Sequence, residues 1–359
     1  PGATLVRLAN EYLSWEEIKM LNAGLDIGFF GGKLELTIDY FDKTTDGLLL
    51  EFAPAEEVGS LSNPTGNLGE INNKGIELTV RSVNVSTGDF RWVTDFNISS
   101  VKNKVVSLPE DADRFSGVNI TRVGEEIGAI YGFETDGLFQ NWDEVYNHAY
   151  QNQSVESYNE ETGLPNYTGN TDDATKENNT APGDIRYVDQ NGDGFIDADN
   201  DRVIIGSTIP DFTWGLNNTV SYKGITLSVF LQGVQGVDIY NSLRVGLESS
   251  NSSFANMRED VLNRWKGEGT SNSIPRAVFS NPNSNGRASQ HWLEDGSFVR
   301  IKNVRLSYSF PKALLQSIGL ENAGVNFYAV GTNLVTFTKY SGFDPEISLR
   351  DADNPETAG

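Results

Sequence analysis

The sequence predicts an all-β protein that forms part of a large antiparallel barrel in a membrane. Apolar and polar residues alternate with a period of two along stretches of roughly nine to twelve residues, longer than the strands of most globular sheets. Aromatic residues gather at the ends of these stretches, where membrane interfaces belong, and short and long connections alternate between them. The 359 residues include 36 glycines and 11% aromatic residues, a composition typical of large antiparallel sheets.

The alternating stretches follow one another along the chain. In KLELTIDYF (33–41), Leu36 and Ile38 lie on one face and Thr37 lies on the other. The same period is found in LNAGLDIGFF (21–30), GIELTVRS (75–82), FRWVTDFNIS (90–99), FTWGLNNTVSY (212–222), ITLSVFLQG (225–233), VRLSYSF (304–310) and VNFYAVGTNL (325–334). Irregular spacing over 300–303 predicts a β-bulge.

The connections between these stretches are of two kinds. Tight turns are predicted at residues 31–32, 86–89 and 223–224. Between them lie four long polar connections, at 43–74, 101–122, 134–211 and 234–298. Outer-membrane barrels have short turns on the periplasmic side and long loops outside, so this alternation favours a barrel.

Two architectures produce alternating strands. A β-sandwich buries the apolar face, whereas a membrane barrel turns that face toward lipid and the polar face toward its lumen. A sandwich gives no reason for all the long loops to lie at one end, so the barrel is the preferred interpretation. No run of about 18 apolar residues predicts a transmembrane helix, and barrel strands of about ten residues do not require one.

One helix is predicted, within the connection 234–298. Apolar residues recur at three- and four-residue spacing along FANMREDVLNRWKGEG (254–269), namely Phe254, Met257, Val261, Leu262 and Trp265. Gly267 then ends the pattern. We expect this helix to pack against the mouth of the barrel.

The composition excludes several classes of function. The formal net charge is −23, and so acidic a surface repels phosphate backbones, so we expect no nucleic-acid partner. The chain has no cysteine, which rules out disulfides and thiol nucleophiles. His148 and His291 have no motif around them and are interpreted as polar loop residues. No pair of carboxylates stands out as a glycosidase site, and no enzymatic activity is predicted.

The stretch DQNGDGFIDADND (189–201) is similar to a calcium-binding loop of the EF-hand type. Its oxygen-bearing residues alternate, which allows them to surround Ca²⁺ with about six to eight hard oxygen ligands. Gly194 supplies the sharp turn, and the candidate ligands are Asp189, Asn191, Asp193, the backbone carbonyl of Phe195, Asp197 and, as closing carboxylate, Asp201. Asn200 occupies the usual twelfth position, so one residue is inserted near Ala198. The alternative is a solvated Asp–Gly turn without a metal.

A family resemblance is carried by residues 181–241. This run contains, in order, GDI, the Asp-rich loop, IIG, PDFTWG, YKG and FLQGVQGVDIYN, and it resembles the SusC/RagA family of TonB-dependent outer-membrane transporters of Bacteroidetes. Further similar segments are GLDIGFFGGKLELTIDYFDKTTDGLL (24–49), NKGIELTV (73–80), GAIYGFETDGLFQ (128–140), WLEDGSFVRIKNVRLSYSFP (292–311) and GTNLVTFTKYSGFDPE (331–346).

The resemblance implies a barrel of about 22 strands with a plugged lumen, of which residues 1–359 are a C-terminal portion and 181–205 an extracellular calcium-type loop. It implies that the protein lies in the outer membrane, surrounded by lipid, and imports an oligosaccharide or a peptide with energy from TonB. A SusD-like surface lipoprotein is the implied partner. The plug, the TonB box and the final strand are expected outside this chain, whose ends, Pro1 and Gly359, do not resemble natural termini. The alternative is a secreted, calcium-stabilised β-sandwich adhesin or lectin.

Overall fold

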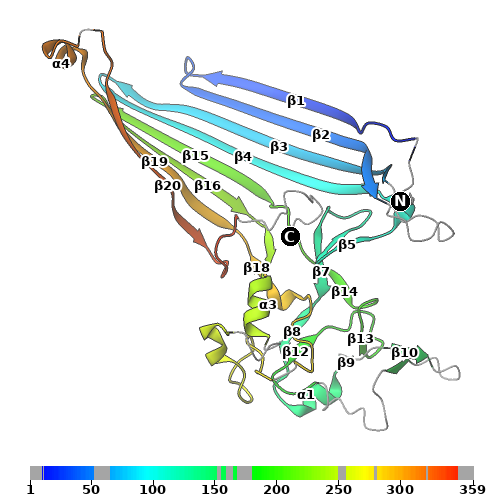
Figure 1. The fold of residues 1–359 in the computed structure, drawn as a ribbon. Helices are drawn as coiled ribbons and strands as arrows, with labels where there is room; N and C mark the ends of the chain where they lie inside the picture. Colours follow the sequence, from blue (N-terminus) through cyan, green and yellow to red (C-terminus); the bar gives the residue numbers. More distant parts are fainter. Residues whose placement is uncertain are drawn as a thin grey trace, which may run out of the picture.

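The computed structural model describes residue 10 and residues 12–51, 65–151, 155–158, 165–167, 180–249, 256–278, 281–320 and 322–346. Its principal element is one antiparallel sheet of eight strands, in the order β1-β2-β3-β4-β15-β16-β19-β20 (Figure 1). The strands are β1 (Glu17–Phe29), β2 (Leu34–Glu51), β3 (Thr65–Thr87), β4 (Phe90–Ser107), β15 (Phe212–Tyr222), β16 (Ile225–Gln235), β19 (Phe298–Ser309) and β20 (Asn326–Thr338).

The register of the sheet separates apolar from polar side chains. One row of directly paired residues crosses all eight strands and is apolar throughout: Ile27, Leu36, Val80, Phe96, Leu216, Leu231, Ile301 and Val335. The adjacent row, on the opposite face, has no apolar side chain: Asp26, Thr37, Thr79, Asn97, Gly215, Gln232, Arg300 and Thr336. The sheet therefore has an apolar face and a polar face, as the period of two predicted.

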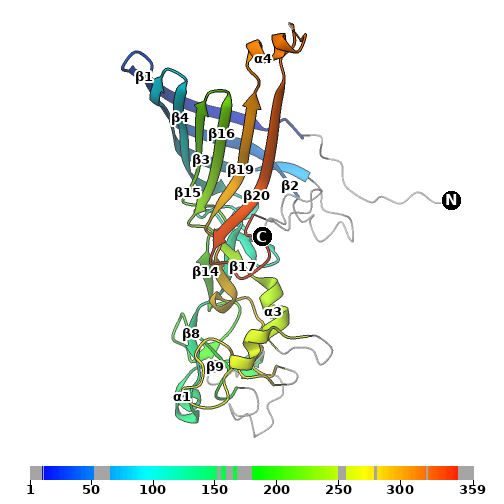
Figure 2. The ribbon, with the colours of Figure 1, turned by 90° about the vertical axis from the view of Figure 1, so that its left-hand side faces the viewer.

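No second layer covers the apolar face in the part of the chain that the structure describes (Figure 2). Large side chains on that face are exposed, among them Leu25, Ile38, Leu227, Val335 and Phe337. An uncovered apolar surface of this extent is unfavourable in water and indicates contact with lipid.

The sheet has a turn end and a loop end. At the turn end, residues 30–33, 88–89 and 223–224 join β1 to β2, β3 to β4 and β15 to β16, so the three predicted tight turns are confirmed. Gly31 and Gly32 have φ angles of 67° and 83°, in the left-handed region that glycine adopts without strain. The fourth connection at this end, 310–325, is longer and contains the helix α4 (Lys312–Ser317).

Aromatic side chains mark a paired row at the turn end. Phe90, Tyr222, Tyr308 and Phe327 share this row with Ile225. The rings of Phe90 and Tyr222 have centroids 6.5 Å apart, and those of Tyr308 and Phe310 are 4.9 Å apart. An aromatic girdle is thus present at this level, where a barrel wall meets the membrane interface.

Several strands are longer than the sequence predicted. β2 continues to Glu51, β3 begins at Thr65 and β4 continues to Ser107, so residues 43–51, 65–74 and 101–107 of the predicted loops 43–74 and 101–122 are strand. Residues 52–64 of the first loop lie outside the described residues. Backbone pairing continues in these strand extensions although the alternation of apolar residues has ended, because Thr44, Asn72 and Lys104 are polar yet paired in register. The bulge predicted near 300–303 is confirmed by a register shift between Ile301 and Asn303.

The connections 108–211 and 236–297 fold together at the loop end into one unit, here called the loop module (Figure 1). Its strands are β5 (Arg114–Ser116), β6 (Asn119–Thr121), β7 (Ala129–Phe133), β8 (Thr135–Leu138), β9 (Tyr150–Gln151), β10 (Val155–Tyr158), β11 (Pro165–Tyr167), β12 (Ile185–Tyr187), β13 (Phe195–Ile196), β14 (Arg202–Gly206), β17 (Asp238–Tyr240) and β18 (Leu293–Asp295). Its helices are η2 (Pro109–Asp111), α1 (Trp142–Asn147), α3 (Ser242–Glu248), η3 (Glu259–Asn263) and η4 (Gln290–Trp292). Among the described residues, no helix is long and apolar enough to cross a membrane.

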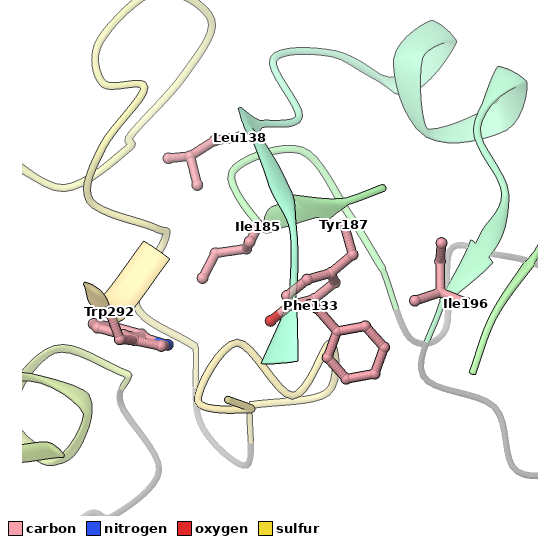
Figure 3. Packing of buried hydrophobic residues seen from close by; sticks show 6 residues of the cluster. All are labelled: Phe133, Leu138, Ile185, Tyr187, Ile196 and Trp292. Carbon is pink, nitrogen blue, oxygen red and sulfur yellow. The ribbon is translucent and has the colours of Figure 1, made fainter. Parts of the chain in front are cut away.

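The main hydrophobic core lies in the loop module. Figure 3 shows Phe133, Leu138, Ile185, Tyr187, Ile196 and Trp292 gathered from five short elements. Trp292 belongs to the second connection and the other five to the first, so the core holds the two connections together. The Trp292 indole N–H donates to the backbone carbonyl of Asn285 (2.9 Å), which satisfies its buried polar atom.

The helix predicted over 254–269 is wrong in the part that the structure describes. Residues 254 and 255 lie outside the described residues, and beyond them only the short η3 is helical. Val261 is buried, but Met257 and Leu262 are exposed, and Trp265 packs instead against the core of the loop module. The apolar spacing arises from separate contacts and not from one helical face.

Candidate functional site

The Asp-rich loop 189–201 is held among the short strands of the loop module. It follows β12, contains β13, which pairs in parallel with β9, and ends immediately before β14. The carboxylate of Asp189 accepts hydrogen bonds from the backbone N–H groups of Gly192 (2.7 Å) and Gly194 (2.8 Å). Gly194 has a φ of 88°, so the predicted sharp turn is present.

Asp201 joins the two halves of the loop. Its buried carboxylate accepts hydrogen bonds from the backbone N–H groups of Gln190 (2.8 Å) and Asp197 (2.6 Å). Burial raises the pKa of the Asp201 carboxyl; these hydrogen bonds oppose the rise, and the charges of Asp189 and Asp197 add to it. Negative charge is therefore concentrated inside the loop.

The remaining side-chain candidates bond within the loop. Asn191 Nδ2 donates to Asp193 Oδ2 (2.9 Å), and Asp193 accepts a hydrogen bond from the Phe195 backbone N–H (2.9 Å). Asp197 accepts hydrogen bonds from the backbone N–H groups of residues 199 and 200, both at 2.8 Å. These short bonds stabilise the turn without a ligand.

The donor chemistry of the loop fits Ca²⁺, but its oxygen atoms do not converge on one point. Carboxylate and carbonyl oxygens are the ligands that calcium prefers, and each oxygen already bonded to an N–H keeps a second lone pair. Across the described ranges, no three acidic or histidine side chains are grouped closely enough to hold a metal ion. Binding would therefore require the exposed side chains to turn inward.

A buried polar network joins the two connections of the loop module. Asp184 is fully buried and binds Arg276 through both carboxylate oxygens, at 2.8 and 2.9 Å. Asn285 Nδ2 donates to Asp184 (3.0 Å), and Asn285 Oδ1 accepts a hydrogen bond from the Ile185 backbone N–H (3.0 Å). A buried charge needs these partners, so the network fixes how the two connections dock.

Asn283 extends this network toward β9. Its Oδ1 accepts hydrogen bonds from Gln151 Nε2 (2.7 Å) and Thr180 Oγ1 (2.8 Å), and its Nδ2 donates to the Ile185 carbonyl (3.1 Å). Because Asn283 is fully buried, these bonds account for the cost of removing its amide from water.

A polar cleft of about 460 Å³ opens beside α1. It is lined by Leu138, Gln140, Glu144, Arg186, Glu268 and Asn272, together with residues 269 and 271. Arg186 pairs with Glu144 (3.3 Å), and its buried Nε has no hydrogen-bond partner among the described residues. This combination of amides, carboxylates and a guanidinium is suited to hydrogen bonding a polar ligand.

The two histidines have different surroundings. His148 ends α1 and lies edge-on to Phe139, with ring centroids 5.1 Å apart. His291 is in η4 and packs edge-on against Trp292 (4.5 Å), and burial, with a contribution from Arg244, lowers its pKa to about 3. The interpretation of His291 as a polar loop residue is therefore wrong, because its neutral ring is packed against the core.

Sequence reasoning missed the residues of the buried polar network. Asp184 lies in the GDI run, which carries the family resemblance but indicates no structural role for it, and Arg276, Asn283 and Asn285 stand in polar stretches with no period. The partners are far apart along the chain: Asn285, which donates a hydrogen bond to Asp184, is 101 residues away from it in the sequence. Pairing of that kind has no local signal, so only the tertiary structure identifies it.

The sheet and the loop module together define a class of protein. A one-layer antiparallel sheet with an apolar face, a polar face, an aromatic row at its turn end and long connections gathered at its loop end is the wall of a transmembrane β-barrel.

Comparison with known proteins finds relatives over nearly the whole chain. TonB-dependent receptor P3 of Formosa agariphila is 35% identical over 98% of this chain and 33% of its own length. TonB-dependent receptor SusC of Bacteroides thetaiotaomicron is 27% identical over 96% of this chain and 31% of its own length. The solved structure of the RagAB peptide transporter has the same fold, with a TM-score of 0.70 at 22% identity, over 96% of this chain and 34% of that one. No family model matches.

The relatives at 30% identity or more are TonB-dependent receptors and SusC is a further relative, so the resemblance of this chain to the SusC/RagA family is confirmed. The chain spans about a third of the length of the curated relatives that it matches.

Proposed function

We propose that this chain forms wall and surface loops of an outer-membrane importer for an oligosaccharide or a peptide. The observation that carries the proposal is the register, which gives eight strands one continuous apolar face and one polar face. Such a sheet separates lipid from a polar lumen and does not enclose a core. The relatives are named receptors, and the import of a nutrient requires no chemistry on it. The alternative of a secreted β-sandwich is not favoured, because a sandwich requires a second sheet against the apolar face.

The loop end would face the outside of the cell and the turn end the periplasm. Support comes from the sizes of the connections, since only the loop end carries the folded module. In bacterial barrels the longer connections are extracellular.

A SusD-like surface lipoprotein would bind over the loop module, and TonB would energise the complete protein. Exposed apolar side chains on the module support such a partner, among them Trp142, Tyr146, Leu243, Met257 and Leu262. Trp142 and Tyr146 stack with centroids 5.8 Å apart, and aromatic residues are enriched at protein interfaces. Peptide is the cargo named for RagAB, and the polar cleft beside α1 offers hydrogen-bonding groups to either class of cargo.

The Asp-rich loop would bind one structural calcium ion. Asp189, Asn191, Asp193, Asp197 and Asp201 would supply side-chain or water-mediated oxygens, and Phe195 its carbonyl. The concentration of carboxylates around Asp201 supports this proposal, because a divalent cation would relieve their repulsion. The ion would brace the module and supply no catalytic step.

Cysteine labelling on intact cells tests the orientation, and the chain itself has no cysteine to interfere. In the full-length protein, Ser273→Cys lies in the loop module and Asp89→Cys in a turn. We expect a membrane-impermeant maleimide to label Ser273→Cys on intact cells and Asp89→Cys only after lysis. Labelling of Asp89→Cys on intact cells would reverse the proposed sidedness.

The calcium proposal is tested by thermal unfolding of the purified full-length protein with 1 mM CaCl₂ or with a chelator. Calcium at about 10 to 100 times its dissociation constant stabilises the bound state by about 1.4–2.7 kcal/mol. The stabilisation should disappear in Asp189→Asn/Asp193→Asn and persist in Glu110→Gln/Asp111→Asn, which removes two exposed acids elsewhere. An equal response in both variants would leave the metal-free turn as the correct interpretation.

Purification in mild detergent at low salt tests the partner. A surface lipoprotein should co-purify, and the interface should bury more than the roughly 1,600 Å² of a standard complex. Isolation of the protein alone in every preparation would contradict this part of the proposal.

A further inference from the structure

Among the described residues, two lysines near the loop end of β4, Lys102 and Lys104, have no ionic partner. On the same face of the sheet as Ile76, the next two rows toward the loop end are polar. In these rows, Lys74 of β3 pairs with Lys102 of β4, and Asn72 pairs with Lys104. Lys74 binds Asp42 (3.1 Å), whereas Lys102 and Lys104 are exposed and have no carboxylate partner within the described residues. Asp42 compensates the charge of Lys74, so the ammonium groups of Lys102 and Lys104 are left to attract an anion.

The height of these lysines matches a membrane surface. On β4 the aromatic row at the turn end contains Phe90, and Lys102 lies on the same face further along the strand. At about 3.3 Å per residue and a strand tilt of about 40°, Lys102 is about 30 Å above Phe90, which equals the thickness of the hydrocarbon core. Lys102 and Lys104 therefore reach the headgroup level of the opposite leaflet.

A cleft of about 450 Å³ adjoins Lys104 and Lys74. Its lining includes Val105, Val106 and Val123 together with Lys74 and Lys104. On the membrane side of the lysines, the apolar face of β3 and β4 has exposed side chains such as Ile76 and Trp92, which suit an acyl chain, while the ammonium groups suit a negatively charged head. Glu70 also lines the cleft and would repel a phosphate, which directs the headgroup toward Lys102 and Lys104.

We propose that Lys102 and Lys104 bind the phosphate of an anionic lipid in the outer leaflet, with an acyl chain lying along the apolar face of β3 and β4. The inference rests on the proposed function, because it requires the loop end to lie at the cell surface. The net charge of −23 does not oppose it, since the two ammonium groups are local and the attraction falls off within about 10 Å.

The test is binding of lipid A, a bisphosphorylated glycolipid, to the full-length protein in neutral detergent, measured by titration of intrinsic or attached fluorescence. The variant Lys102→Gln/Lys104→Gln should bind lipid A at least about tenfold more weakly than wild type, and Lys102→Arg/Lys104→Arg should retain binding. The control Lys33→Gln/Lys223→Gln removes two lysines at the turn end and should bind within about twofold of wild type.

Phosphatidylcholine should show no dependence on Lys102 and Lys104, and inorganic phosphate should compete with lipid A only at far higher concentration. Equal binding of lipid A by both glutamine variants would overturn the proposal, as would equally effective competition by inorganic phosphate, which would indicate a site for a free anion. The cysteine labelling distinguishes failure of the lipid site from failure of the proposed orientation. If Ser273→Cys is labelled on intact cells and Asp89→Cys is not, but lipid A binding does not depend on Lys102 and Lys104, only the lipid site is refuted.

Discussion

The carboxylate of Asp184 accepts bonds from Arg276, from Asn285 and from the Ala181 backbone N–H (2.9 Å), all inside the loop module. Replacing Asp184 by Asn removes the charge that compensates Arg276, so we expect the free energy of unfolding of the module to fall by about 3–5 kcal/mol. Denaturant unfolding of the purified protein measures this loss.

The control for that measurement is Asp136→Asn. Asp136 also binds an arginine, Arg186, at 2.7 Å, but its side chain is 73% exposed. Exposed ion pairs contribute about 0–1 kcal/mol, so its loss should be small. Similar losses for the two variants would show that burial of Asp184 does not determine its contribution.

His291 gives the loop module a dependence on pH. Burial lowers its pKa to about 3 from 6.5, so between these values the unfolded state binds a proton that the folded state does not. The free energy of unfolding is unaffected above pH 6.5 and should fall below it, by at most about 1.4 kcal/mol per pH unit. Thermal unfolding of wild type and His291→Gln between pH 7 and 4.5 measures this, and equal slopes for the two would contradict it.

For single residues, a role could be predicted from the sequence where a local pattern exists and could not be predicted where none exists. Asp189 and Gly194 belong to a run whose spacing alone predicts a tight turn, and the structure has that turn. The partners of Asp184 are distant in the chain and follow no period. His291 was misinterpreted because its burial depends on Trp292 and Arg244 packing around it, which composition does not reveal.

Among the elements, β15 shows most directly what the two faces of the sheet require. Leu216 lies on the apolar face in the row with Phe96 and Leu231, and the next residue, Asn217, lies on the polar face opposite Asp95. Leu216→Lys should destabilise the folded barrel by about 2–4 kcal/mol, because it places a charge in lipid. Asn217→Lys should change stability little.

The difference is measured by unfolding the two variants of the full-length protein in lipid vesicles. Gel electrophoresis detects the folded barrel in each sample, because a folded barrel resists denaturation by heat. The variants introduce the same side chain one residue apart, so propensity and expression are matched. Equal stability would mean that the apolar face of β15 does not contact lipid.

Strand identity was predicted correctly where apolar residues alternate, and strand length was not. The periodic part of β3 is only its central third, yet pairing extends from Thr65 to Thr87 because backbone hydrogen bonds do not depend on which side chains they carry. The opposite error occurred near Val261, where three- and four-residue spacing predicted a helix although its members contact different neighbours.

In the whole molecule, the sheet and the loop module are stabilised by different forces. The module contains buried clusters, around Trp292 and around Ile120, whereas the sheet is held by its hydrogen-bond ladders and by contact with lipid. We therefore expect the module to unfold before the sheet as guanidinium is raised. Hydrogen exchange followed by mass spectrometry on the full-length protein in detergent should show earlier exchange at 129–151 and 180–206 than in β15 and β16.

The control is Asp184→Asn, which should advance exchange in the module and leave that of β15 and β16 unchanged. Simultaneous exchange of module and sheet, in wild type and variant alike, would indicate one cooperative unit.

The loop module is made from two excursions that leave the sheet on either side of the β15–β16 hairpin, and both contribute side chains to a shared interior. Neither excursion has a complete set of partners without the other: Asp184 would lose Arg276, and Trp292 would lose Tyr187 and Ile185. A graft that moves one of them into a related barrel should therefore misfold, while the pair transplanted together should fold. Among related barrels, the two excursions would then be inherited together as a matched pair. Recombination within the β15–β16 hairpin would separate them and would be selected against.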